Sequence, residues 1–172
     1  HFAPPLAHVR PEHRDEPDYR RALNLPNPKR VGTAYVSKLT VVDEFAQNPS
    51  KAQRYWQIRQ KLAQKQKGAD RVFLSRGDWG TIRILRNEKE LMDRFQAEGY
   101  SIVDISKASF ADLSRVLSGA SVVVSVEGSH LTHALFAMAD FGTIIILNPP
   151  GRALTTVAGI APFCKLFAAM FI

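Results

Sequence analysis

The sequence predicts an α/β protein with a Rossmann-like parallel sheet and flanking helices. From Arg71 onward, short apolar runs alternate with amphipathic segments, and the runs are rich in Val and Ile without apolar–polar alternation. Such runs are typical of parallel strands that are buried on both faces and joined by crossover helices. Right-handed crossovers of this kind build a Rossmann-like sheet.

The first part of the chain is predicted to differ from the rest. Residues 1–30 contain most of the prolines and three of the five histidines, and no helical or strand period is sustained there. We expect an extended arm or linker over these residues, followed by a short strand at Val31–Val36. The predicted division is an arm with a strand and a basic helix over 1–69, and a Rossmann-like domain over 70–172.

The segment Lys51–Lys67 is predicted to form an amphipathic helix that ends at Gly68, because Tyr55, Ile58 and Leu62 recur at three- and four-residue spacing. This segment carries six cations and no carboxylate. Two interpretations stay open: a solvated helix face, or a surface for an anionic partner.

The remaining elements are predicted in strict alternation. The strands are expected at Arg71–Leu74, Tyr100–Ile105, Ser121–Val126 and Thr143–Leu147, and the helices at Asn87–Ala97, Ser109–Leu117 and Ser129–Ala139. Two helix starts, Asn87 with Glu90 and Ser109 with Asp112, have the spacing of a capping box.

Composition limits the class of protein. The chain has 172 residues, a formal net charge of +7 and one cysteine, Cys164, which excludes an internal disulfide and a cysteine-rich zinc site. Apolar runs are too short to span a membrane. A single cysteine favours a reducing compartment, so we expect a cytoplasmic protein. The start at His1, without a leader sequence, is typical of a fragment.

One candidate site follows the strand that ends at Val126. Gly128 permits close approach of a ligand, Ser129 can cap a helix or bind an anion, and His130 and Thr132 follow in the first turn. A phosphate or an ordinary helix cap explains this turn equally well. Glu127 suits a sugar hydroxyl or an arginine partner, and His130 with His133 suits hydrogen bonding better than a metal.

The other candidate site follows the strand that ends at Leu74. Arg76, Arg83 and Arg86 lie where forked guanidinium groups would reach a diphosphate, although Arg86 can also pair with Glu90. Trp79 suits stacking on a base or packing as a lid. Ser75 and Ser129 lack the surroundings of an acyl-transfer nucleophile. Because both sites follow adjacent strands of the predicted sheet, we expect them to converge on one ligand.

The order of these motifs resembles glycosyltransferase family 61. The resemblance covers about residues 70–150 and rests on four segments: Val72–Arg76, Arg83–Leu91, Glu98–Val103, and Val124–Phe136. It implies the C-terminal, donor-binding half of an inverting transferase of GT-B architecture, with the second domain elsewhere. Arg76 and Arg83 would then contact the donor diphosphate, and Gly128, Ser129 and His130 would support it.

The sequence departs from the common family pattern at three positions. Glu127 stands where many members have His, Ser129 where they have Ala, and His133 where they have Asn. We associate the Glu-Gly-Ser-His form with bacterial members. These departures leave the identity of the donor open.

The leading hypothesis is a glycosyltransferase that uses a nucleotide-sugar donor and a glycan or other hydroxyl acceptor. Without an Asp-x-Asp pair in the sequence, we expect no metal and no further cofactor. Nucleic acid is not expected as a partner, and a homo-oligomer is possible. The alternatives are a non-enzymatic basic domain that binds nucleic acid or an acidic partner, and an inactive member of the family.

Overall fold

The structure is a computed structural model that describes residues 6–8, 14–39, 47–64, 66–77, 85–150 and 156–171. The contacts divide the chain into two compact units, His1–Lys51 and Ala52–Ile172. This division falls earlier than the boundary predicted at residue 70, because most of the basic helix belongs to the second unit.

The first unit contains a small βαβ motif. Strand β1 (Leu6–His8) pairs in parallel with β2 (Lys29–Val31), and helix α1 (Glu16–Leu23) connects them. The prediction of an extended arm over residues 1–30 is therefore wrong for the described part of that stretch. The predicted strand at Val31–Val36 is also misplaced, because β2 ends at Val31.

Local charges explain why α1 forms despite its lack of buried side chains. Pro17 lies in the first turn, where its missing N–H costs nothing, and Asn24 ends the helix in the left-handed conformation with φ 54°. The Arg20 guanidinium lies 2.9 Å from the Glu16 carboxylate one turn earlier. Its hydrogen bond lowers the pKa of Glu16 below the ordinary value.

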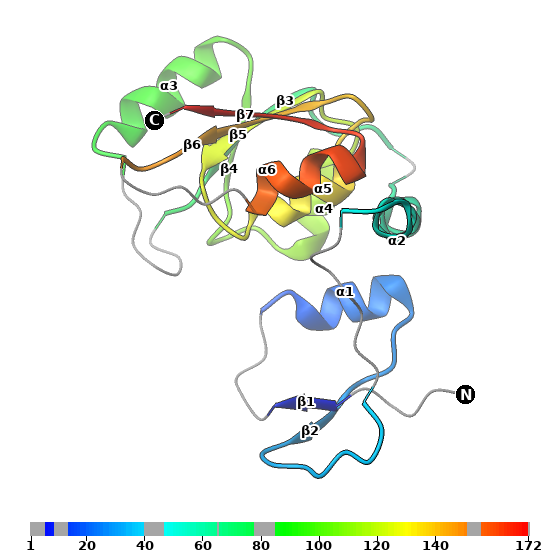
Figure 1. The fold of residues 1–172 in the computed structure, drawn as a ribbon. Helices are drawn as coiled ribbons and strands as arrows, with labels where there is room; N and C mark the ends of the chain where they lie inside the picture. The colour runs from blue at the N-terminus through cyan, green and yellow to red at the C-terminus, as the bar shows by residue number, and fades with distance from the viewer. Residues whose placement is uncertain are drawn as a thin grey trace. The chain divides into compact units, whose positions relative to one another are not determined.

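The second unit is built on a five-stranded sheet in which all strands run parallel (Figure 1). Their spatial order is β4 (Ser101–Asp104), β3 (Arg71–Ser75), β5 (Val122–Val126), β6 (Thr143–Leu147) and β7 (Phe167–Phe171). The four predicted strands are confirmed, and the Rossmann-like fold class is confirmed with them. Strand β7 was not predicted.

Helices cover both faces of this sheet, because successive side chains of each strand point to opposite faces and most of them are apolar. Helix α3 (Glu88–Ala97) packs on one face, where Phe73 stacks on Phe95 at 5.1 Å between ring centroids. Val72 and Leu74 belong to the core on the other face, which is shared with α4 (Phe110–Leu117) and α5 (Leu131–Ala137). Figure 1 shows α3 on one side and α4, α5 and α6 on the other. Burial on both faces explains the continuous apolar runs.

The two predicted capping boxes have different outcomes. At Ser109 the box is present: the Oγ atom accepts from the Asp112 amide at 3.1 Å, and the Asp112 carboxylate accepts from the Ser109 amide at 3.2 Å. At Asn87 no side chain caps α3, and Glu88 instead accepts a hydrogen bond from Ser75. The prediction for Asn87 and Glu90 is therefore wrong.

The segment from Thr156 to Phe171 adds a helix, a 3-10 turn and an edge strand of the sheet. Helix α6 (Thr156–Ile160) leads into a 3-10 turn, η1 (Ala161–Cys164), and then into β7. The Cys164 side chain is fully buried, and this burial raises the pKa of its thiol to about 11. On β7 itself, Phe167, Met170 and Phe171 are exposed.

Helix α2 (Pro49–Leu62) ends five residues before the predicted limit of Lys67. Gly68 therefore does not end the helix. A glycine is needed there because a Cβ atom would collide with the carbonyl groups of Arg115 and Val116. On the apolar face of α2, Tyr55 stacks on Phe136 at 5.9 Å and Leu62 is buried. None of the described helices is long and apolar enough to cross a membrane.

Arg59 ties α2 to the end of α5. Its guanidinium donates to the carbonyl oxygens of Leu135 at 2.5 Å and Met138 at 2.7 Å, and to the Asp140 carboxylate at 2.9 Å. Carbonyl groups at the end of a helix lack partners within the helix, and a cation there is favourable. The interpretation of the helix as a simply solvated face is therefore wrong at Arg59.

We expect Ser109→Ala to lower the free energy of unfolding by about 1 kcal/mol, because the capping box is lost. Asn87→Ala is the matched control, and its change is expected to stay within about 0.5 kcal/mol because that side chain makes no cap. Urea denaturation measures both. Equal losses for the two variants would contradict this assignment.

We expect Arg59→Met to destabilise the protein by about 2 kcal/mol, since three acceptors lose a charged donor while the buried methylene packing is kept. The same substitution at the exposed Lys61, on the same helix, should change stability by less than about 0.5 kcal/mol. Thermal and urea denaturation would measure the difference. A loss at Lys61 as large as that at Arg59 would show that helix propensity, not the bonds, is responsible.

Candidate active site

The direction of strand addition reverses between β3 and β5. From β3 the chain first adds β4 on one side, then crosses back to add β5, β6 and β7 on the other. In open parallel sheets, ligands bind beyond the carboxyl ends of the strands at such a reversal. The two candidate sites expected from the sequence follow these two strands. The pairing of β3 with β5 confirms that the two strands are adjacent.

Three buried polar side chains come directly after strands at this edge. Arg76, Glu127 and Asn148 are the first residues after β3, β5 and β6, and each is 8% exposed. The atoms Nη1 of Arg76, Oε2 of Glu127 and Oδ1 of Asn148 are shielded from solvent. Leu74 is paired with Ser125, so continuing the register by two residues places Arg76 opposite Glu127. Buried charged side chains are uncommon outside functional or paired positions, which makes this edge the strongest candidate site.

A hydrogen-bond chain crosses the seam between β3 and β5. The Ser125 hydroxyl donates to the Leu74 carbonyl at 2.7 Å, and its Oγ atom lies 2.7 Å from Nε2 of His130. Because the single hydroxyl proton lies toward Leu74, His130 must be the donor in the second contact. Ser125 is therefore not an activated nucleophile, since its proton points away from the histidine.

The turn before α5 is tighter than expected. The helix begins at Leu131 rather than Ser129, and its N-cap residue, His130, makes no side-chain cap. The amides of Leu131, Thr132 and His133 donate to carbonyl groups three residues earlier, at 3.0 to 3.1 Å. Ser129 therefore does not cap this helix, and these three amides are bonded within the turn. The alternative, that Ser129 binds an anion, stays a prediction. The amides of Gly128 and Ser129 are not among these three donors.

The two histidines of this turn have different surroundings. His130 is half-buried and bonded to Ser125, whereas His133 is buried, with its ring 6.1 Å from that of Phe110. Within the described residues, no three His, Cys, Asp or Glu side chains group in a way that would hold a metal ion.

The ends of β3 and β4 are held in place by local hydrogen bonds. Ser75 donates to the Glu88 carboxylate at 3.0 Å, which joins the end of β3 to the start of α3. At the end of β4, the Asp104 carboxylate accepts from the amide and the hydroxyl of Ser106. Burial opposes ionisation of Asp104, but these bonds and a hydrogen bond from Lys107 outweigh it and lower its pKa.

The remaining predicted residues lie at the margin of the described structure. Arg83 and Trp79 fall outside the described residues. Arg86 is exposed just before α3, and no ion pair joins it to Glu90 in the part of the chain that the structure describes. Thr132 is half-buried in the first turn of α5.

Two residues of the site were missed in the sequence. Ser125 lies inside an apolar strand, where a lone hydroxyl among valines is the available signal. Asn148 is the first polar residue after the Ile-rich strand β6, in the same position relative to its strand as Arg76 and Glu127. Because ligands bind beyond the carboxyl ends of parallel strands, the residue after each apolar strand is a candidate, and this signal points to Asn148.

The sequence of the chain matches a known protein family over most of its length. The family model described as Glycosyltransferase 61 matches residues 2–146. Because this match covers most of the chain, the protein belongs to the glycosyltransferase 61 family and is a glycosyltransferase. The match begins far before residue 70, so the family sequence extends over the small βαβ unit as well. No curated protein matches the chain.

We expect neutral His130 to carry its proton on Nε2, because Ser125 can only accept from it. Heteronuclear NMR of the imidazole nitrogens, at a pH where the ring is neutral, identifies the tautomer. In Ser125→Ala the preference should weaken while the signals of His133 keep their tautomer. An Nδ1-protonated ring in the unmodified protein would contradict this hydrogen-bond direction.

Proposed function

We propose that this glycosyltransferase binds a nucleoside-diphosphate sugar at the carboxyl edge between β3 and β5 and transfers the sugar with inversion to a glycan or other hydroxyl acceptor. The observation that carries the proposal is the buried guanidinium of Arg76 at the point where the strand order reverses. An arginine fork matches the paired oxygens of a diphosphate.

The proposed transfer is a single displacement. The acceptor oxygen forms a bond to the anomeric carbon from the face opposite the diphosphate, and the bond from that carbon to the diphosphate oxygen breaks with its electron pair. The acceptor proton leaves to a base. Negative charge therefore grows on the diphosphate, where Arg76 and Arg83 would stabilise it, with Arg86 as a further cation.

The turn after β5 would position the same ligand. In the proposal, the amides of Gly128 and Ser129 bind diphosphate oxygens, and His130, fixed by Ser125, holds the shape of the turn. Glu127 accepts a hydrogen bond from a ribose or sugar hydroxyl, beside Thr132 in the next turn. Asn148, at the end of β6, supplies an amide to the same edge.

Further parts of the proposal come from the family resemblance and the composition. They are a GT-B architecture with the acceptor reached across a cleft, leaving-group stabilisation without a metal, the association with bacterial members, and a cytoplasmic location. A second candidate, nucleic acid or an acidic partner on helix α2, receives less support, because Lys51 and Arg59 of that helix are buried.

We expect uridine or guanosine diphosphate to bind the wild-type protein and Arg76→Ala to weaken that binding at least about tenfold, because a charge-assisted contact is lost. Isothermal titration calorimetry measures the affinities. Arg115→Ala, which removes an exposed arginine of α4 that pairs with Asp112, is the control for net charge.

Arg76→Lys shows whether the fork matters beyond the charge, and circular dichroism verifies that each variant is folded. Absence of binding by the wild type, or equal affinity for Arg76→Ala, would overturn the proposal. Binding without turnover in the presence of acceptors would identify an inactive family member.

A further inference from the structure

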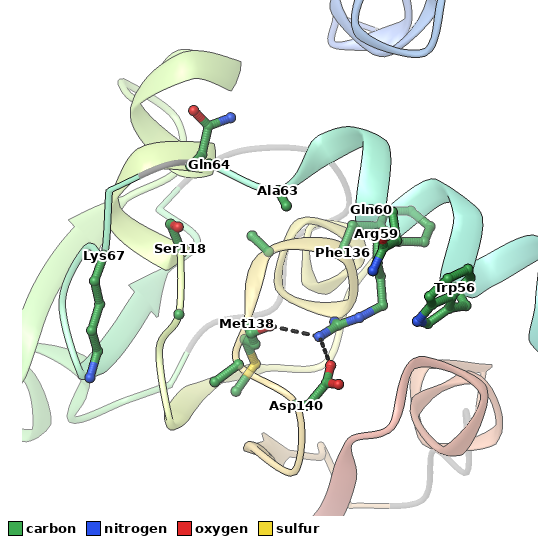
Figure 2. A pocket seen from close by; sticks show the side chains of 13 residues that line it. Trp56, Arg59, Gln60, Ala63, Gln64, Lys67, Ser118, Phe136, Met138 and Asp140 are labelled. Carbon is green, nitrogen blue, oxygen red and sulfur yellow. Dashed lines mark hydrogen bonds and ion pairs between the residues drawn. The ribbon is translucent and has the colours of Figure 1, made fainter.

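A pocket of about 550 Å³ lies at the edge of the sheet opposite the candidate active site. Its walls come from α2 and the segment after it, from the last turn of α5, and from the loops that follow α4 and α5. Those loops lead into β5 and β6, so the pocket opens at the amino ends of the strands. Figure 2 shows Trp56 and Lys67 toward opposite sides of the pocket, with Arg59 reaching between them to Met138 and Asp140.

We propose that this pocket binds a neutral carbohydrate chain. That this chain is a part of the acceptor glycan, held away from the point of transfer, rests on the proposed function. The binding chemistry itself rests on three features of the lining: an exposed aromatic ring, uncharged hydrogen-bonding groups, and internally paired charges.

Trp56 provides the aromatic surface. Its side chain is 44% exposed, whereas most large apolar side chains of this unit are buried. It borders the main pocket and also a second hollow of about 280 Å³ that Pro162 and Phe163 line. The apolar C–H face of a pyranose packs on an indole ring, and an indole between two hollows fits a chain of more than one sugar.

The uncharged polar groups of the lining suit hydroxyl groups. Gln60 and Gln64 lie four residues apart and contribute amides, which donate and accept, and Ser118 adds a hydroxyl group. Gln64 uses one donor on the Leu62 carbonyl at 3.3 Å. Sugar hydroxyls also donate and accept, so such a lining can bind them in several orientations. The volume is in the ordinary range for small-ligand sites, roughly 300 to 1,000 Å³.

The charges of the pocket disfavour an anionic ligand. Helices α4 and α5 end here, and the carbonyl groups at helix ends carry partial negative charge. Arg59 is engaged by two of these carbonyls and by Asp140, whose other oxygen lies 3.0 Å from Lys165. Lys67 lies 3.3 Å from Asp70. With its cations paired internally, the pocket is better matched to a neutral ligand than to a phosphate.

The test uses neutral trisaccharides as probes: maltotriose, xylotriose and chitotriose. We expect at least one to bind with a dissociation constant on the order of 1 mM and to change the fluorescence of Trp56, measured in a Trp79→Phe background. Trp56→Ala should weaken binding about tenfold, and Gln60→Ala should also weaken it. Saturation-transfer NMR measures binding in the variant that lacks Trp56.

Matched controls define the outcome. Gln57→Ala alters an exposed amide on α2 that is not part of the lining, and Tyr35→Ala removes an exposed ring elsewhere; both should bind like wild type. Failure of every trisaccharide to bind, or unchanged binding by Trp56→Ala and Gln60→Ala, would overturn the inference. Loss of nucleotide binding in Arg76→Ala with trisaccharide binding retained would separate this pocket from the donor site.

Discussion

The reversal of strand order between β3 and β5 is the constraint on which the described structure of the second unit depends. Both strands are buried on two faces, and the first residue after each of them, Arg76 or Glu127, is a buried charged side chain at the same edge. Ser125 connects the two strands, because its hydroxyl donates a hydrogen bond to the Leu74 carbonyl of β3 and its oxygen accepts one from His130. The same two hydrogen bonds therefore link the paired strands, the turn before α5 and the candidate site.

The parallel arrangement also gives the sheet two electrostatically different edges. Crossover helices begin near the carboxyl ends of the strands and end near the amino ends, so donors gather at one edge and carbonyl groups at the other. Arg59 donates hydrogen bonds to carbonyl groups at the amino edge, and Arg76 lies at the carboxyl edge. Arg59 is thus one of the cations behind the net charge of +7 that forms bonds within the fold.

Much of the second unit could be predicted from local pattern alone. Four strands were found because their residues are apolar on both faces, and the capping box at Ser109 was found because its two partners are three residues apart. Strand β7 was missed because its exposed phenylalanines and small residues lack the Val/Ile signature. Helix α1 was missed because prolines surround a short segment held by ion pairs.

The candidate site could be predicted at the level of strand ends but not of bonds. Arg76 and Glu127 follow apolar strands, which is visible in sequence. The Ser125–His130 contact requires the register of β3 on β5, and the role of Arg59 requires α2 to lie beside the end of α5. Neither relation has a local signal, because each joins residues that folding brings together.

The burial of Cys164 has a practical consequence for following the motions of this protein. The only thiol of the chain lies in η1, between α6 and β7, with no exposed surface and a raised pKa. A thiol reagent can react with it only when that segment opens, so the labelling rate reports the opening equilibrium of the sheet edge. The sequence thus contains a single built-in chemical reporter, placed where the last strand joins the core.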